Sequence, residues 1–410
     1  METLSLNQSM AIDKFKKLKV GALFMQQGSG KTRVAVELIN STDVNLAVFF
    51  CPFSTKKNLE LELIKWKLSK EYMIIGYESI SASDTLYLEI LEKLKNENNV
   101  FLVADESIFI KNEKSKRFNR LIELSKHSEY RLILNGTPIT KNEWDLYNQM
   151  YFLSPKIIEM QRIEFLNVFF KKIKYKKKGQ SEREFYKLSE VNIDYLHKLI
   201  EPYIFNSELI FEKKENVVEI SIDASVNTTE DYQEAKEYLL DALEQGECKV
   251  EMFSQLANIC FSDKERHKKM AEHIKGQMIV FCTLLSEIET LSKLIDCYVI
   301  TGNTKNRHEI IEQFKNDNKP LLITFGTGAF GLNLQFCNKI AFASLTFDYA
   351  KIDQAKARIK RIGQHKDIEY IFFTSSLGIF NMIKENVKRK MTLEELMITK
   401  IMEGSINECI

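Results

Sequence analysis

A short apolar run, Val20–Met25, leads directly into the segment Gln26-Gln-Gly-Ser-Gly-Lys-Thr32, and a helical pattern follows. This order of strand, glycine-rich loop and helix is the context that a phosphate-binding loop requires. Glycines let backbone N–H groups converge on phosphate oxygens, and the start of the following helix adds a favourable dipole. The sequence therefore predicts a phosphate site after the first strand, with an ordinary glycine-rich turn as the alternative.

The loop supplies both backbone and side-chain ligands for a nucleotide. The residues expected around the phosphates are Gly28, Ser29, Gly30, Lys31 and Thr32. Lys31 is expected to reach the β- and γ-phosphates, and the Thr32 hydroxyl is expected to bind Mg²⁺. Met25 stands where the strict pattern has glycine, so the motif is the looser helicase type.

Two adjacent carboxylates, Asp105 and Glu106, come directly after the apolar run Phe101–Ala104. Alone, such a pair is often a solvated turn. With a phosphate loop upstream, it predicts a catalytic pair. Asp105 is then expected to hold the Mg²⁺, and Glu106 to orient or deprotonate the attacking water.

A third feature lies some three hundred residues after the phosphate loop, in a predicted helix at Tyr349–Arg361. Gln354, Arg358 and Arg361 are spaced i, i+4 and i+7, so one helical face would present two guanidinium groups. A phosphate loop with distant arginines suggests an ATPase whose site closes between two lobes.

Apolar runs that alternate with amphipathic stretches predict an α/β fold with parallel sheets. A chain of 410 residues is too long for one ordinary core and suits two domains. The expected strands are Val20–Met25, Leu46–Cys51, Met73–Gly76, Val100–Ala104, Arg131–Leu134, Met278–Phe281, Cys297–Ile300, Leu321–Thr324, Lys339–Ala343 and Ile368–Phe373. The expected division is a first lobe at 1–158, helical insertions and a linker at 159–275, a second lobe at 276–390 and a C-terminal helix or tail at 391–410.

Composition excludes several classes of protein. The formal net charge is +1, so any nucleic-acid surface must be a local patch. The seven cysteines include no Cys-x-x-Cys pair, which favours reduced thiols over a zinc site. No signal pattern and no membrane-length apolar run appear, so we expect a soluble, cytoplasmic protein.

In chain order, the motifs resemble those of the Swi/Snf-type DNA translocases of helicase superfamily two. The segments that carry the resemblance are Leu4–Gln8, Cys51–Ser54, Gly76–Ile80, Asp105–Asn112, Arg131–Pro138, Tyr151–Pro155, Ile300–Gly302, Gly328–Leu334 and Gln354–Gln364. The ending Arg361-Ile-Gly-Gln364 is the most specific of them, because strand-separating RNA helicases usually carry a different sequence there.

The resemblance implies a fold of two RecA-like parallel-sheet lobes in tandem, with helical insertions between them. It implies a DNA-dependent ATPase that uses ATP and Mg²⁺ in the cleft between the lobes and moves along double-stranded DNA. Gln8 is then expected at the adenine, Gly331 and Gln354 at the nucleotide, and Gly136 and Thr137 in the coupling motif. The implied DNA contacts are Ser54, Lys56, Tyr77, Lys111, Gly302, Arg307, Thr327 and Gly328. We expect a small, monomeric motor of phage or bacterial type, in the bacterial host cell if phage-encoded.

The sequence departs from the family pattern at several positions. Ile108 replaces a usual His, Asn135 a usual Thr and Ala329 a usual Gly, and Asn206-Ser207 falls where paired arginines are common. None of these changes removes an atom needed for phosphate chemistry. The basic run Lys171–Lys178 is either a solvated segment or a protrusion that grips duplex DNA.

Two other functions stay open at this point. One is a helicase that separates the strands of DNA or RNA with the same ATP chemistry. The other is a nucleic-acid-binding scaffold that has lost turnover. Intact Lys31, Asp105, Glu106, Arg358 and Arg361 argue against the scaffold, because they are the complete set of phosphoryl-transfer groups.

Overall fold

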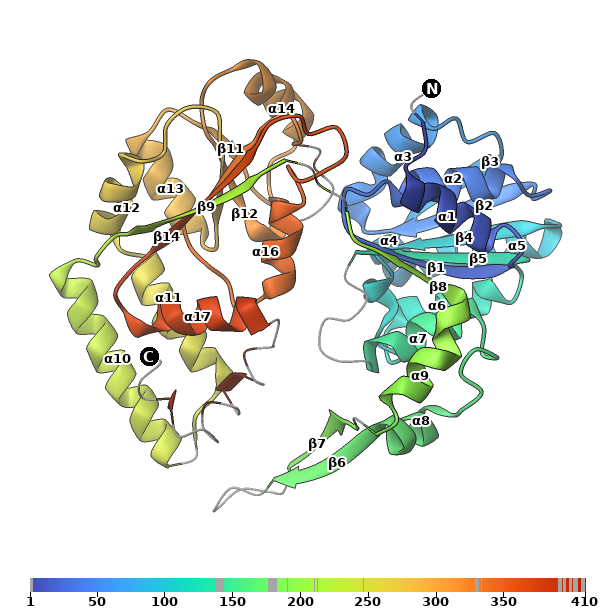
Figure 1. Ribbon diagram of the computed structural model, residues 1–410, viewed down its shortest axis with the longest axis horizontal. Helices are drawn as coiled ribbons and strands as arrows, with labels where there is room; N and C mark the ends of the chain where they lie inside the picture. Colours follow the sequence, from blue (N-terminus) through green and yellow to red (C-terminus); the bar gives the residue numbers. More distant parts are fainter. Residues whose placement is uncertain are drawn as a thin grey trace. The chain divides into compact units, whose positions relative to one another are not determined.

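The chain forms two compact units, Met1–Ile210 and Phe211–Ile410, which we call the first and second lobes. Each has its own sheet (Figure 1). The computed structural model describes residues 3–136, 144–175, 183–189, 191–209, 211, 213–245, 247–328, 332, 334–389, 393, 396–397, 400, 405–406 and 410.

The first lobe is built on a six-stranded parallel sheet of order β3-β2-β4-β5-β1-β8. Its strands are β1 (Val20–Met25), β2 (Leu46–Cys51), β3 (Glu71–Gly76), β4 (Val100–Asp105), β5 (Tyr130–Asn135) and β8 (Ile204–Ser207). Its helices are α1 (Leu6–Phe15), α2 (Lys31–Asn40), α3 (Lys56–Lys65), α4 (Tyr77–Ala82), α5 (Asp84–Asn96), α6 (Lys116–Ser125), α7 (Trp144–Leu153), α8 (Arg162–Phe169) and α9 (Ile193–Ile200).

Alternate residues of the central strands enter two different cores, because successive side chains of a strand point to opposite faces. On β2, Val48 and Phe50 join the core formed with α5, α6 and α7, whereas Ala47 and Phe49 join the core formed with α1, α2 and α3. All of β2 is buried. Helices therefore cover both faces, as expected for a parallel sheet.

The second lobe repeats this plan with the strand order β11-β12-β10-β13-β14-β9. Its strands are β9 (Glu215–Ser221), β10 (Ile279–Cys282), β11 (Tyr298–Ile300), β12 (Leu321–Thr324), β13 (Lys339–Phe342) and β14 (Ile368–Thr374). Its helices are α10 (Val226–Glu244), α11 (Val250–Phe261), α12 (Lys264–Ala271), α13 (Leu285–Leu294), α14 (Arg307–Asn316), α15 (Phe325–Gly328), α16 (Tyr349–Lys356) and α17 (Gly378–Arg389). Two successive parallel sheets confirm the expected fold of two RecA-like lobes in tandem.

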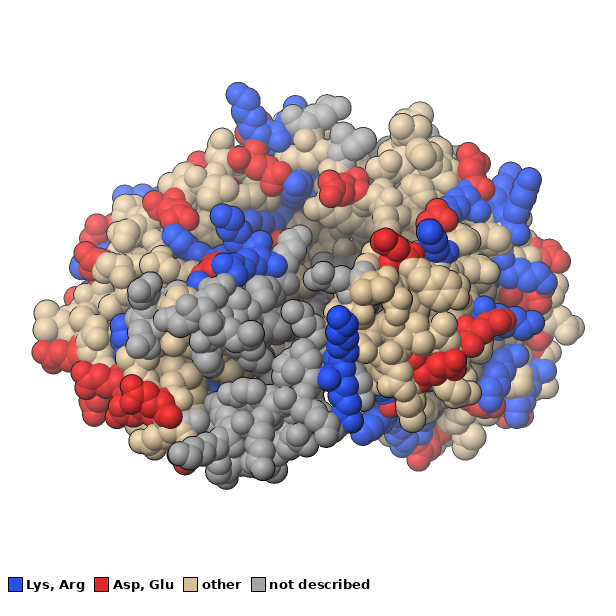
Figure 2. Space-filling model, turned by 60° about the horizontal axis from the view of Figure 1, so that its bottom comes forward, with Lys and Arg blue, Asp and Glu red and all other residues tan. Residues whose placement is uncertain are grey.

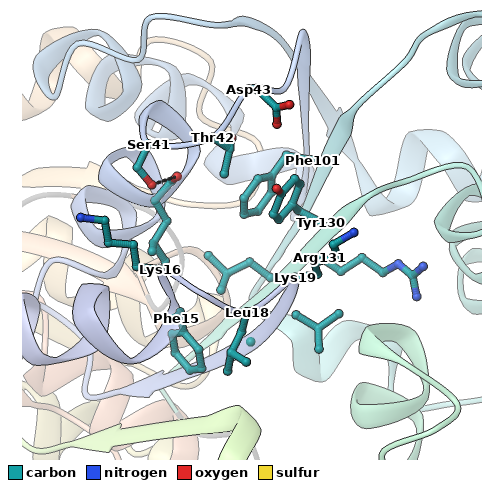
Figure 3. A pocket seen from close by; sticks show the side chains of 14 residues that line it. Phe15, Lys16, Leu18, Lys19, Ser41, Thr42, Asp43, Phe101, Tyr130 and Arg131 are labelled. Carbon is teal, nitrogen blue, oxygen red and sulfur yellow. Dashed lines mark hydrogen bonds between the residues drawn. The ribbon is translucent and has the colours of Figure 1, made fainter.

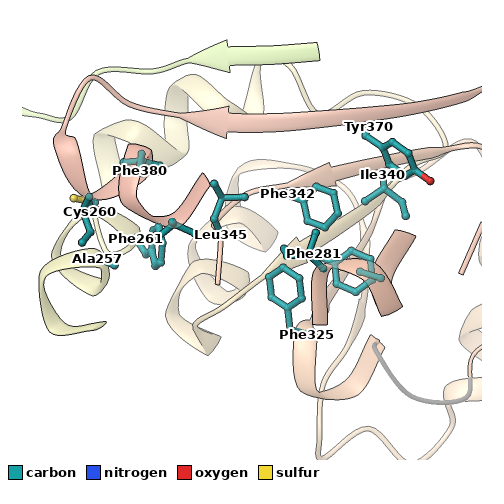
Figure 4. Packing of buried hydrophobic residues seen from close by; sticks show 14 of the residues in the cluster. Ala257, Cys260, Phe261, Phe281, Phe325, Ile340, Phe342, Leu345, Tyr370 and Phe380 are labelled. Atoms are coloured by element: carbon teal, nitrogen blue, oxygen red, sulfur yellow. The ribbon is translucent and has the colours of Figure 1, made fainter. Parts of the chain in front are cut away.

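Aromatic rings fill the main core of the second lobe (Figure 4). The Phe342 ring lies 5.9 Å from that of Phe281, 6.0 Å from that of Phe325 and 4.7 Å from that of Phe372. Such ring pairs add to the stabilisation from apolar burial alone. The sheet is thus a firm base for the loops at its edge.

The middle of the chain differs from the expectation of helical insertions and a linker poor in strands. β8 and β9 lie in this stretch, and each completes the sheet of a different lobe. A two-stranded antiparallel sheet, β6 (Phe170–Tyr175) and β7 (Arg183–Leu188), lies between α8 and α9 in sequence. The stretch 159–275 is therefore divided between both lobes at residue 210.

Arg266 of α12 is a fully buried cation in the second lobe. Its guanidinium donates to the carbonyl oxygens of Ala343 at 3.2 Å and Phe373 at 3.0 Å, and it lies 5.1 Å from the centre of the Phe380 ring. Glu287, also fully buried, attracts this charge. Arg266 thus joins α12 to the ends of β13 and β14.

Replacing Arg266 by methionine is expected to destabilise the second lobe by about 3 kcal/mol, because two carbonyls lose their donor and the buried Glu287 carboxylate loses a nearby positive charge. Lys268→Met is the matched control on the same helix. Its ion pair with Glu265 is more than half exposed on both side chains and should contribute less than about 1 kcal/mol. Urea unfolding of both variants checks this; equal midpoints would contradict it.

Candidate active site

The predicted phosphate loop has the backbone shape that anion binding needs. β1 ends at Met25, and α2 begins at Lys31 with Gly30 as its N-cap. Gly28 and Gly30 both have φ of 81°, a left-handed conformation that favours glycine. The exposed N–H groups of the first helical turn can therefore point at an anion.

Two neighbouring segments hold this loop in place. The Gln8 amide donates to the Ser29 carbonyl at 3.0 Å, and a Cβ at Gly30 would stand only 2.3 Å from Gln8 Nε2. On the other side, the Gln26 backbone N–H donates to the Ser207 carbonyl at 3.0 Å. β8, which the sequence did not predict, thus braces the phosphate loop.

Gln8 also has a local function in its own helix. Its side chain accepts from the Ser5 N–H, while the Ser5 hydroxyl accepts from the Gln8 N–H, so the two form a capping box on α1. With only 3% of its surface exposed, Gln8 links α1 to the phosphate loop. Its expected adenine contact stays a prediction.

The two carboxylates lie beside the phosphate loop, because β1 and β4 end at the same edge of one parallel sheet. Asp105 is the last residue of β4, and Glu106 has φ of 50°, unusual for a residue other than glycine. The Gln27 amide nitrogen lies 3.5 Å from Glu106 Oε1. The Lys31 ammonium donates to the Met25 carbonyl at 2.9 Å.

Burial and the charges of Glu106 and Lys31 act on the pKa of Asp105. Removal from water and the nearby Glu106 raise the pKa of Asp105 to about 7, and the Lys31 charge lowers it. A divalent cation would stabilise the deprotonated form of this carboxylate. Ser29 Oγ is buried and has no hydrogen-bond partner among the described residues, so a phosphate oxygen would satisfy it. These observations fit a bound nucleotide with its metal.

Tyr77 is a correction to the expected DNA contacts. Its side chain is fully buried, its hydroxyl donates to the Asp105 carbonyl at 2.8 Å, and its ring stacks on Phe109 with centroids 5.5 Å apart. A side chain in this position cannot reach a ligand on the surface. Tyr77 instead supports the end of β4 at Asp105.

Sequence reasoning missed a buried polar chain behind the carboxylates. The Asn135 amide lies 3.4 Å from Ser107 Oγ, which donates to Gln149 Oε1 at 2.5 Å. All three side chains are fully buried, and Gln149 also donates to the Asp145 carbonyl at 2.8 Å. The available signal was the polar pair Asn148-Gln149 inside the otherwise apolar Leu146–Leu153. This chain joins the segment after β4 to β5 and α7.

The expected coupling residue Gly136 follows β5 and touches the phosphate loop. A Cβ at this position would stand 2.6 Å from Gln27 Cγ. The other expected coupling residue, Thr137, lies outside the described residues. The absence of a side chain at Gly136 therefore permits its backbone to approach Gln27, the residue that contacts Glu106.

We expect Gly136→Ala to lower ATP turnover about tenfold or more, because Gln27 must shift away from Glu106 and small displacements of catalytic groups are costly. The matched control is Gly326→Ala, which places a methyl group in open space. Steady-state ATP hydrolysis of both proteins is the measurement. A Gly136→Ala protein as active as the control would contradict the proposed contact.

The arginines of the second lobe lie beyond the helix that was expected to carry them. α16 ends at Lys356, and the bonds from Arg358 N to Ala355 O and from Ile359 N to Lys356 O have the spacing of turns. The expected helical face with both guanidiniums is therefore wrong. Arg358, 5% exposed, donates to the Leu332 carbonyl at 3.3 Å, and half-buried Arg361 donates from Nε to the Ala357 carbonyl at 2.7 Å.

Gln354 and Gln364 flank these arginines, and both are 8% exposed. Gln364 donates to the carbonyls of Gln335 and Cys337, each at 2.9 Å, which anchors the turn that follows the arginines. Gln354 Oε1 is buried and has no hydrogen-bond partner among the described residues. Gly331, the other expected nucleotide contact here, lies outside the described residues.

The remaining expected DNA contacts differ in how accessible they are. Ser54 and Gly302 are exposed, and Lys56 is half-buried. Lys111 pairs with Asp145 at 3.5 Å. The side chains of Arg307 and Thr327 are engaged locally, Arg307 with the carbonyls of 301, 302 and 304, and 7%-exposed Thr327 with Thr324 at 2.9 Å. Gly328 ends α15. Their contacts with DNA stay predictions.

A separate cavity of about 280 Å³ lies at the opposite edge of the first sheet (Figure 3). Val20 and Tyr130, which begin β1 and β5, line it together with Lys16, Lys19 and Asp43. The phosphate loop follows the other end of β1, and Asp105 and Glu106 lie at the corresponding end of β4, so this cavity is distinct from the candidate active site.

The described parts of the chain contain no group of three or more His, Cys, Asp or Glu residues arranged to hold a metal ion, and no disulfide joins the six cysteines among them. None of the helices described here is long and apolar enough to cross a membrane.

Comparison with known proteins places the chain in a family. Residues 39–280 match the family model of the SNF2-related domain, and residues 253–363 match that of the helicase conserved C-terminal domain. The Saccharomyces cerevisiae protein "ISWI chromatin-remodeling complex ATPase ISW2" is 23% identical over 92% of this chain, which covers 39% of that protein. An "Uncharacterized ATP-dependent helicase" of Mycoplasma pneumoniae is 22% identical over 83% of this chain and 34% of its own length.

One solved structure, "Sulfolobus solfataricus SWI2/SNF2 ATPase core in complex with dsDNA", is 18% identical, with a TM-score of 0.44, and the match covers 100% of this chain and 95% of that chain. This chain spans well under half of each curated relative described above. The model of the SNF2-related domain spans more than half of this chain and includes Asp105 and Glu106. The chain therefore belongs to the SNF2-related family, with a helicase conserved C-terminal domain in its second lobe.

Proposed function

We propose that this protein is a DNA-dependent ATPase that moves along double-stranded DNA. The observation that carries the proposal is the cluster of Lys31, Asp105 and Glu106 around a glycine-rich loop at the start of α2. Membership of the SNF2-related family supports the same chemistry. The curated relatives include remodelling ATPases and ATP-dependent helicases.

In this proposal, the loop N–H groups and Lys31 hold the β- and γ-phosphates of ATP. A magnesium ion held by Thr32 and Asp105 would neutralise the charge that develops on the phosphates. Glu106 orients and deprotonates the attacking water, and Gln27, 3.5 Å away, positions the Glu106 carboxylate. The hydrogen bond from Tyr77 to the Asp105 carbonyl and the one from Ser107 to Gln149 hold the segment that contains Asp105 and Glu106 in place.

Arg358 and Arg361 stabilise the transition state when the second lobe approaches the nucleotide. Turnover then depends on the conformation of the two lobes, and DNA bound to both lobes can shift the population toward the active one. Repeated closing and opening would step the protein along its track. Contacts would be mainly to phosphates, hence independent of base sequence and sensitive to salt.

The test is ATP hydrolysis with duplex DNA, single-stranded DNA or RNA at one fixed salt concentration. The proposal predicts the strongest stimulation by the duplex. A helicase that separates strands is the second candidate, favoured by the match to the helicase conserved C-terminal domain. Stimulation by RNA alone would exclude the translocase, and unwinding of a forked duplex would favour the helicase.

A further inference from the structure

The antiparallel pair β6–β7 belongs to neither parallel sheet. Figure 1 shows it extending away from α8 and α9 of the first lobe, well apart from the six-stranded sheet of that lobe. Since isolated two-stranded ribbons are marginal in water, such an arm needs either a firm base or a partner.

The base of this arm is fixed in the core of the first lobe. Phe169 and Phe170 are 0% and 4% exposed, and the Phe170 ring lies 5.9 Å from Phe165 and 6.0 Å from Trp144. The Ser189 N–H closes the base with a bond of 2.8 Å to the Phe169 carbonyl. Beyond this base, Lys171 and Lys172 are exposed.

The arm concentrates positive charge in a chain that is otherwise balanced. The twelve residues of its two strands include five cations, Lys171, Lys172, Lys174, Arg183 and Lys187, and one acidic residue, Glu184. Their net charge of +4 in a chain of +1 leaves −3 for all other residues. Figure 2 shows cations and anions interspersed over the face it presents. A strong local excess of positive charge is therefore not a general feature of this surface.

The strand register adds a second reason to expect an anionic partner. Lys171 is paired with Lys187, and Tyr175 with Arg183, whereas only Lys174 has an acidic partner, Glu184. Like charges placed directly opposite each other destabilise a strand pair. A polyanion would remove this cost.

We propose that the β6–β7 arm is a DNA-binding ribbon that lies in the major groove of the duplex. Two strands about 5 Å apart, with their side chains, match a groove about 12 Å wide, and strands of six residues extend about 20 Å along it. Lysines and aromatic residues suit phosphate and sugar contacts without base specificity. The inference rests on the proposed function, since it takes duplex DNA as the partner.

The test replaces Lys171, Lys172, Lys174 and Lys187 by glutamine in the full chain. Because each lost phosphate contact lowers the slope of log K against log salt by about 0.9, we expect the slope to fall by about 2 or more, with at least tenfold weaker duplex binding. ATP hydrolysis without DNA should be unchanged. The same four positions changed to arginine should keep the slope of the parent protein.

A matched control removes four exposed charges elsewhere, at Lys95, Lys126, Lys268 and Lys293. This variant should bind duplex DNA with nearly the parent slope. Equal slopes for the arm variant and the parent, or equal losses in both glutamine variants, would overturn the arm proposal and leave the proposed function intact. A parent protein that fails to bind duplex DNA at all would overturn both.

Discussion

Glu106→Gln is expected to reduce ATP turnover by a factor of about 10²–10⁴, the usual contribution of a positioned general base. Glutamine keeps the shape of the side chain but cannot accept the proton of the attacking water. Glu106 is held in the left-handed conformation at φ of 50°, and its Oε1 lies 3.5 Å from the Gln27 amide nitrogen. ATP binding should change little, because Lys31 and the loop N–H groups remain.

Single-turnover hydrolysis and equilibrium binding of ATP, measured on the same preparation, separate these two effects. Glu89→Gln on α5 is the matched control, since it makes the same chemical change at an exposed position. Unchanged hydrolysis in Glu106→Gln would remove this residue from the mechanism. Loss of binding instead of hydrolysis would mean that Glu106 supports the loop and does not act on water.

Arg361→Ala is expected to lower kcat in the presence of duplex DNA by about 10³, with a much smaller effect on ATP affinity. Arginines that act on the transition state of phosphoryl transfer contribute on the order of 10³–10⁵ in rate. Arg361 is half-buried, and its side-chain Nε donates a hydrogen bond of 2.7 Å to the Ala357 carbonyl, which orients the guanidinium. The rate should fall because the transition-state charge loses this donor.

Arg361→Lys should recover only part of the rate, because an ammonium cannot make the paired hydrogen bonds of a guanidinium. Arg389→Ala, which removes an exposed arginine paired with Glu385 on α17, is the control and should leave kcat unchanged. A rise in KM with normal kcat would show instead that Arg361 contributes equally to ground-state and transition-state binding.

The regular parts of the fold could be predicted from the sequence, because they depend on local patterns. All ten expected strands are present, with bounds that differ by at most two residues, as in Glu71–Gly76 for the expected Met73–Gly76. β6 and β7 were missed because a lysine-rich run does not resemble a buried strand. β8 and β9 were missed because β8 has only four residues and β9 is mostly exposed, so neither forms the apolar run of a buried strand.

The candidate site, like the fold, has one part that could be predicted from the sequence and one part that could not. Lys31, Asp105 and Glu106 follow strands of one parallel sheet, so their proximity follows from the fold class. The burial of Tyr77 depends on packing between distant segments, which local patterns do not encode. The same holds for the side-chain hydrogen bonds that link Asn135, Ser107 and Gln149. Spacing alone could not predict the end of α16, because the i, i+4 and i+7 pattern of Gln354, Arg358 and Arg361 does not show where the backbone bonds change to the spacing of turns.

The most direct test of the central claim is the ratio of kcat with duplex DNA to kcat without it, measured for the parent protein and for Arg361→Ala. If DNA acts by bringing the second-lobe arginine to the nucleotide held by Lys31, the parent ratio should be about ten or more and the variant ratio close to one. An Arg361→Ala protein that DNA stimulates by the same factor as the parent would contradict this account.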